Sequence, residues 1–145
     1  MTETSQAHTY VHVEHQAPHT RSNQKFKNVV SGKGRTSFEG KIYVQPEAQQ
    51  TQAYQLCNTL LLSDEGRAYS KPNLEIFADD VKASHGATVG QVDEESLFYL
   101  LARGVPKREA KQLLIEGFLM EILDEMQLSS LSKEWFSRVT AKLLA

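Results

Sequence analysis

The chain has 145 residues, enough for one modest domain, and its 40% hydrophobic and 23% charged composition is ordinary for a globular protein. A formal net charge of −2 argues against a nucleic-acid partner, and no apolar run approaches the roughly 20 residues of a membrane-spanning helix. The single cysteine, Cys57, excludes an internal disulfide framework and fits a reducing cytoplasm.

The first part of the chain is expected to form β-strands separated by turns. Alternating polarity or a high content of β-branched and aromatic residues marks five segments, at 9–15, 26–30, 36–44, 54–62 and 74–77. Glycine, proline, asparagine and serine cluster between these segments, as expected for turns.

A weak repeat of 32 residues relates 31-SGKGRTSFEGKIYV-44 to 63-SDEGRAYSKPNLEI-76. The matching pairs are Ser31/Ser63, Gly34/Gly66, Arg35/Arg67, Ile42/Leu74 and Val44/Ile76. The repeat predicts either stacked coils of a β-solenoid, each buried only against its neighbours, or two hairpins that resemble each other by chance.

Within the first part, Cys57 and a set of histidines are candidate metal ligands. Cys57 lies in a strand-like run and by parity shares a face with Thr59 and Leu61, which is typical of a small buried side chain. The histidines are His8, His12, His15 and His19. On a strand, residues four apart share a face but lie roughly 13 Å apart, too far to bind one metal. An exposed polar strand is the alternative interpretation.

The stretch 78-ADDVKASHGATVG-90 fits a catalytic loop, a metal site or a turn. Adjacent strand residues point to opposite faces, so Asp79 and Asp80 are not expected to form an acid–base pair. In a turn, one carboxylate would accept hydrogen bonds and the other would be solvated. His85 is either a metal ligand or titrating group, or an exposed loop histidine.

From Asp93 onward the chain is expected to be helical. Asp93 is a suitable N-cap with acidic residues after it, and Gly104 a suitable C-terminal residue. Pro106 suits the first turn of a second helix, and a third is expected at about 130–143. The predicted apolar face of the second helix consists of Ala110, Leu113, Leu114, Gly117, Phe118, Ile122 and Met126. These helices could cover the open end of the strand stack.

Together these segments resemble a known family. The run 71-KPNLEIFADDVKASHGATVGQVDEESLFYLLARGVPKREAKQLLIEGF-118 resembles the C-terminal signature of SufD-type chains in the SufB/SufD family of iron–sulfur cluster assembly proteins. The upstream residues 17–55 and 57-CNTLLLSDEG-66 resemble the last β-helical coils of that family. Family members are much longer, so the chain is expected to be a C-terminal fragment.

The resemblance implies a mainly β fold with α, comprising the C-terminal coils of a right-handed parallel β-helix over 1–92 and a small α-helical domain over 93–145. It implies a non-catalytic scaffold for nascent iron–sulfur clusters. The implied partners are a SufC-type ATPase on the helical region and a SufB-type paralogue on the β-helix, with a homodimer as a further alternative.

The resemblance also carries over two site residues. His85 occupies the position of the SHGAT histidine, which contributes to a cluster site at the interface with SufB. Imidazole is a reasonable iron ligand beside thiolates or carboxylates. Ala83 stands where many SufD-type chains have cysteine. Cys57 falls where SufB-type chains carry a functional cysteine, so it is a second candidate cofactor-binding residue.

Two other functions remain open from the residues alone. One is a β-helix enzyme acting on a polymer through Asp79, Asp80 and His85. The other is a histidine-rich metal-binding module acting alone. No nucleotide-binding GxxxxGK[ST], hydrolase GxSxG or metalloprotease HExxH motif is present in the sequence.

Overall fold

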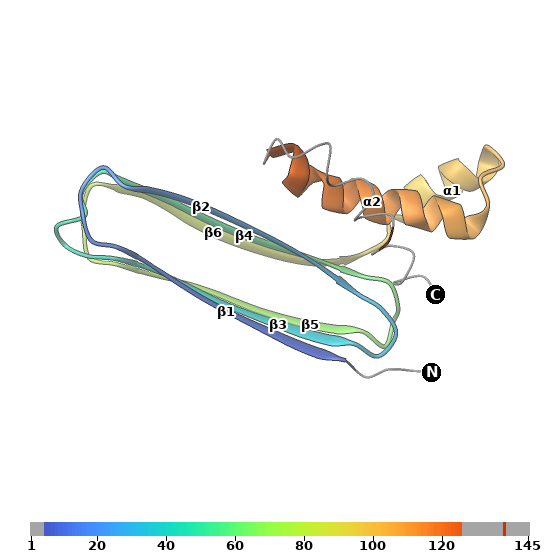
Figure 1. Cartoon of the computed structure of the whole chain (residues 1–145), viewed down its shortest axis with the longest axis horizontal. Helices are drawn as coiled ribbons and strands as arrows, with labels where there is room; N and C mark the ends of the chain where they lie inside the picture. The colour runs from blue at the N-terminus through green and yellow to red at the C-terminus, as the bar shows by residue number, and fades with distance from the viewer. Residues whose placement is uncertain (1–4, 126–137, 139–145) are drawn as a thin grey trace.

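The computed structural model describes residues 5–125 and residue 138, and these form six strands followed by two helices (Figure 1). The strands are β1 (Gln6–His15), β2 (Arg21–Val30), β3 (Arg35–Val44), β4 (Thr51–Leu61), β5 (Arg67–Ile76) and β6 (Val81–Gln91). The helices are α1 (Glu94–Ala102) and α2 (Lys107–Glu125). The fold is therefore mainly β with helices, as predicted. The third helix expected from the sequence lies outside the described residues, apart from the helical Arg138.

The strands form two parallel three-stranded sheets, and the chain alternates between them (Figure 1). One sheet has the order β1-β3-β5 and the other β2-β4-β6. Each of the first four strands therefore pairs with the strand two places further along the chain. The outermost strands in each sheet, β1 and β5 or β2 and β6, have one strand neighbour each among the described residues.

The pairing of β3 with β5 explains the repeat in the sequence. Arg35 is in register with Arg67, and Ile42 with Leu74, so the 32-residue repeat relates directly stacked positions. Equivalent positions in stacked strands face the same side of the sheet and meet similar surroundings. The two segments are therefore adjacent parallel strands of one sheet, so the interpretation as two hairpins that resemble each other by chance is wrong.

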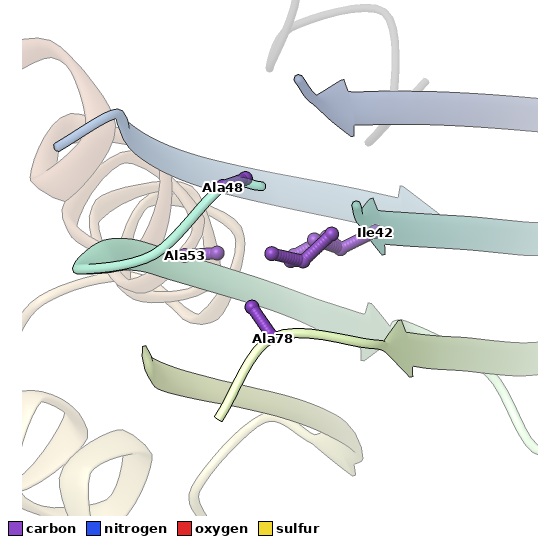
Figure 2. Close-up of a cluster of buried hydrophobic side chains, with 5 residues drawn as sticks. Ile42, Ala48, Ala53 and Ala78 are labelled. Atoms are coloured by element: carbon purple, nitrogen blue, oxygen red, sulfur yellow. The ribbon is translucent and has the colours of Figure 1, made fainter. Parts of the chain in front are cut away.

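An apolar cluster fills one end of the space between the sheets (Figure 2). Its buried members are Ile42, Val44, Ala48, Ala53 and Ala78. Leu74, Ile76, Val81 and Ala83, from β5 and β6, pack against this cluster. The small alanines allow the connecting segments to approach the fully buried Ile42 closely, so that apolar contacts join both sheets.

Further along the strands, the space between the sheets contains a buried pair of amides as well as the tilted rings of Phe26 and Phe38. Gln55 is only 2% exposed, and its amide nitrogen donates to the Gln24 side-chain oxygen at 2.8 Å. Gly40, on the opposite sheet, leaves room for this amide, because a Cβ placed there would lie 2.6 Å from the Gln55 Cδ atom. The Gln55 Oε1 atom and the Gln24 Nε2 atom have no hydrogen-bond partner within the described residues.

Helix α1 begins and ends as its sequence predicts. The Asp93 carboxylate accepts a hydrogen bond from the Ser96 amide at 2.7 Å, which caps the first turn. At the other end, the Gly104 amide donates to the Leu101 carbonyl and the Val105 amide to the Leu100 carbonyl. With Gly104 at a φ of 84°, this is a Schellman motif.

The predicted apolar face of α2 is only partly correct. Ala110 is buried as predicted, but the other fully buried residue is Ile115, which the predicted face omits, and Leu113 is 47% exposed. The difference arises because α2 packs on two neighbours, α1 and the sheet containing β2. The spacing of apolar residues along the sequence predicts a single apolar face, which does not describe a helix that has two contact surfaces.

Helix α2 lies along the outer face of the β2-β4-β6 sheet, rather than over the open edges of the strand stack as expected (Figure 1). Lys27 of β2 is the main attachment, with its side chain 2% exposed. Its ammonium group donates to the Phe118 carbonyl at 2.6 Å, pairs with Glu121 and lies 4.3 Å from the centre of the Phe118 ring. Lys25 pairs with Glu125 one turn further on.

No helix in the described part of the chain is long and apolar enough to cross a membrane.

Candidate functional site

His85 lies in the middle of β6, on the side of that strand which faces the other sheet. It is in register with the buried Gln55 of β4, and it has the same parity as Ala83, which packs against the apolar cluster. Gln55 is covered by strands on both sides, whereas β6 is the last strand of its sheet. The imidazole is therefore exposed although it occupies a position that is buried in the preceding strand.

The ring of His85 makes no hydrogen bond to any residue that the structure describes. A histidine that ligates a metal needs one ring nitrogen free for the ion, and the other usually donates to a carboxylate or carbonyl group. On the same face of β6, the flanking residues Ala83 and Ala87 are small, so no bulky side chain of that strand lies directly beside the His85 ring. The site can accept an incoming group at His85 without displacing a protein partner from the described residues.

Cys57 faces the same side of its sheet as His85 but is fully buried. Its side chain is in register with Phe26 of β2 and Ala87 of β6, and the residue is 1% exposed. The Asn28 side-chain amide donates to the Cys57 sulfur at 3.5 Å. Burial raises the pKa of the Cys57 thiol, with the hydrogen bonds from its neighbours opposing that shift. The thiolate form needed for metal binding is thus disfavoured in this state.

The register separates Cys57 from His85 by two residues along neighbouring strands. Strands about 4.8 Å apart and a rise of about 3.3 Å per residue place the two Cα atoms roughly 8 Å apart. The two side chains therefore occupy the same region, but one is buried and the other exposed. Among the described residues, no group of three or more histidine, cysteine, aspartate or glutamate side chains is arranged to hold a metal ion.

The carboxylates of Asp79 and Asp80 lie in the bend between β5 and β6, and both residues are exposed. The turn hydrogen bonds that were expected of a carboxylate are instead made by the Asp80 backbone. Its amide donates to the Gln49 side-chain oxygen at 2.9 Å, and its carbonyl accepts from the Gln50 amide. Within the described chain, neither carboxylate has a hydrogen-bonded partner that would make it part of a catalytic pair.

The four histidines near the start of the chain do not gather. His8 binds the Ser37 hydroxyl at 2.6 Å on the outer face of its sheet, and His12 is exposed. His15 is buried, with its ring nitrogens hydrogen-bonded to the Thr20 and Ser22 hydroxyls at 2.7 and 2.9 Å. The burial of His15 differs from the exposed polar strand that its sequence suggested. It arises because His15 lies on the same face of β1 as Val11 and Val13, in register with the buried Val44 of β3.

The residues that surround Cys57 and His85 were missed by sequence reasoning. Gln24 and Asn28 lie on β2, where only 26–30 was expected to be a strand, so the parity of Gln24 was not assigned. Gln55 lies in an expected strand, but its burial depends on Gly40 of the other sheet. The one available signal was parity, since Gln55, Cys57 and Thr59 alternate on one face.

Comparison with protein families identifies a match over most of the chain. Residues 1–118 match the family described as "SUF system FeS cluster assembly, SufBD core domain". The match covers all six strands and most of the described helical segment.

Individual relatives agree with this match. The chain is 39% identical over 131 residues to the iron–sulfur cluster assembly protein SufD of Escherichia coli K12, covering 90% of this chain and 31% of that protein. It is 42% identical over 127 residues to a SufBD family protein of Synechocystis, covering 88% of this chain and 28% of that protein. The Bacillus subtilis SufD protein is 38% identical over 106 residues, which cover 73% of this chain and 24% of that relative. The chain thus spans about a third or less of the length of these relatives.

Proposed function

Because the chain belongs to the SufBD core-domain family of iron–sulfur cluster assembly proteins, we propose that it is a SufD-like, non-catalytic scaffold subunit for nascent clusters. It would act with a SufB-type paralogue and a SufC-type ATPase in the cytoplasm. The family match over residues 1–118, together with relatives named SufD at 38–39% identity, is the observation that carries this proposal.

The proposal extends to the architecture. Two observations support a parallel β-helix: the strands alternate between two parallel sheets, and the paired residues of β3 and β5 are one 32-residue repeat apart. We assign residues 1–92 to its C-terminal coils, with the right-handed sense usual for parallel crossovers. We propose residues 93–145, of which the structure describes 93–125 and 138, as the helical domain that binds the ATPase.

His85 is the proposed cluster ligand of this chain. Its exposure on an outermost strand, and the absence of a hydrogen-bonded partner within the described residues, support a role in a site completed by another subunit. A SufB-type partner paired along β6 would supply the remaining thiolate or carboxylate ligands, and a second copy of this chain is the alternative occupant of that edge. Cys57 is the weaker candidate, because its burial disfavours the thiolate.

The test compares His85→Ala with His12→Ala in the complex assembled with SufB- and SufC-type partners. Both histidines are exposed on strands, so the two changes have similar consequences for folding. We expect His85→Ala to lower bound iron and acid-labile sulfide several-fold and His12→Ala to leave them unchanged. Equal cluster content in the wild type and His85→Ala would remove His85 from the site. If the wild-type chain fails to assemble with either partner, the scaffold role itself is wrong.

The proposed ATPase contact has its own test. Arg108 is exposed in the first turn of α2, so its reversal in Arg108→Glu leaves the buried contacts of the helix intact. Weaker capture of the SufC-type ATPase by this variant would place the contact on the helical region. If capture is unaffected by Arg108→Glu and by further reversals on that surface, the ATPase binds elsewhere.

A further inference from the structure

A cavity of about 250 Å³ opens on the outer face of the β1-β3-β5 sheet, on the opposite sheet from His85. Its lining comes from the first residues of the three strands. These residues are Gln6, Ala7, His8, Arg35, Thr36, Ser37 and Tyr69. Among the described residues, the lining contains an arginine, a histidine and three hydroxyl groups but no carboxylate, so no acidic residue of the lining balances the positive charge of the arginine.

Arg35 supplies the positive charge. Its backbone amide donates to the Ser5 carbonyl at 2.8 Å, which holds the start of β3 against the segment before β1. Its guanidinium group has no hydrogen bond or ion pair with any residue that the structure describes. The next guanidinium in register, that of Arg67, is instead occupied by the carbonyl groups of Asp64 and Gly66 at 2.7 and 2.8 Å.

Two acidic residues of this face and its turns, among those that the structure describes, are already paired. Glu39, two residues beyond Ser37, lies 3.6 Å from the Lys71 ammonium group. Glu65, in the turn before β5, lies 3.3 Å from that of Lys33. Arg35 is thus a cation on this surface whose guanidinium group has neither a counter-ion nor a hydrogen bond in the described part of the chain.

His8 and Ser37 add a hydrogen-bond donor whichever tautomer the histidine adopts. The His8 Nδ1 atom and the Ser37 hydroxyl oxygen are 2.6 Å apart. If the hydroxyl donates to Nδ1, the Nε2–H group of His8 remains free to donate. If Nδ1–H donates, the Ser37 hydroxyl hydrogen is free instead. Tyr69, which is 65% exposed at the rim, contributes a phenolic donor.

We propose that this cavity binds a phosphate group through Arg35, the His8–Ser37 pair and Tyr69. A guanidinium fork matches the oxygens of a phosphate, and charge-assisted hydrogen bonds are the stronger class. Several donors around one unpaired cation, without a carboxylate, favour an oxyanion over a metal ion or a neutral ligand. The site is independent of the proposed cluster ligand, since it lies on the other sheet.

The test titrates inorganic phosphate into the isotope-labelled chain at constant ionic strength and follows amide and side-chain resonances. We expect a dissociation constant on the order of 1 mM, with shifts confined to the starts of β1, β3 and β5. Arg35→Gln should weaken binding about tenfold or more, because it removes a charge-assisted contact. Ser37→Ala and Tyr69→Phe should each weaken it a few-fold.

Arg21→Gln is the matched control, because Arg21 is an exposed strand arginine on the other sheet and its loss changes the net charge equally. Unchanged affinity in Arg21→Gln beside a large loss in Arg35→Gln supports the site. Equal losses in the two variants, or shifts spread over both sheets, would overturn it in favour of non-specific attraction. Glycerol phosphate in a second titration separates the sources: tighter binding than inorganic phosphate indicates a phosphate monoester, and weaker binding indicates the free ion.

Discussion

Two regions of the space between the sheets are built on different chemistry. At one end, Ile42, Val44 and three alanines form an apolar cluster. Further along the same strands, Gln55 reaches across to Gly40 and donates to Gln24. The apolar end is stabilised by burial of apolar surface area, which depends little on the exact orientation of the side chains. The polar part depends on hydrogen-bond partners at matching positions.

This difference bears on how strand register is specified. An apolar interior accepts several hydrophobic side chains of similar volume. A buried amide is satisfied only when its partner lies at the correct position, so a shift in register leaves it without a hydrogen bond. The apolar end should therefore contribute most of the stability, and the polar part should report most sharply on specific pairings.

The largest effect is expected from Ile42→Ala at the apolar end. Ile42 is fully buried, and deletion of such a side chain typically costs about 2–5 kcal/mol in the free energy of unfolding. Urea denaturation measures the loss, and Leu113→Ala, at a 47% exposed position on α2, is the control with a small expected effect. Similar losses in the two variants would contradict the assignment of the apolar end as the main source of stability.

A smaller effect is expected from Gly40→Ala in the polar part. The added methyl group would meet the Gln55 amide and force it from Gln24, at a cost of about 1–3 kcal/mol in the free energy of unfolding. The same change made in the Gln55→Ala background should cost much less, because the methyl group then meets no amide. A double-mutant cycle by urea denaturation checks this coupling. Costs that are equal in both backgrounds would mean that Gln55 does not constrain Gly40.

The smallest effect concerns His15, a polar residue next to the apolar end. Burial lowers the pKa of His15 below its ordinary value of about 6.5. The unfolded chain therefore binds the proton first as the pH falls. The free energy of unfolding should therefore be unaffected by His15 above about pH 6.5. It should decline as the pH falls below that value, until the pKa of His15 in the folded state is reached.

Thermal unfolding between about pH 5 and 8 measures this dependence on either side of the ordinary histidine pKa. The pH dependence should be weaker in His15→Gln and unchanged in His12→Gln, since His12 is exposed. An identical pH profile in the wild type and His15→Gln would show that His15 does not contribute to it.

Local sequence patterns anticipated a large part of this fold. Parity in 54–62 placed Cys57 and Thr59 on one face of β4, which is buried, and the caps of α1 follow from Asp93 and Gly104. Strand ends were less accurate, because β2 begins at Arg21, five residues before its apolar run. Polar residues such as Ser22 and Gln24 belong to that strand only because β4 offers a parallel partner.

The sequence predicted which residues belong to the candidate site but not how they are arranged. His85 and Cys57 were named from the sequence and its resemblance to a family, yet their unequal burial depends on β6 being the outermost strand of its sheet. Glycine-rich and polar, β6 has a weak local preference for strand, and its pairing with β4 decides its conformation.

By itself, the sequence determined the helix ends, the strand faces and the 32-residue repeat, because each depends on neighbouring residues or on a period along the chain. The tertiary structure alone decided which distant residues meet. Lys27 holds Glu121 across 94 positions, Gln55 meets Gln24 and Gly40, and Ile115 rather than Leu113 is buried. Such contacts depend on how sheets and helices pack in three dimensions, and local propensity carries no information about a partner that is distant in the chain.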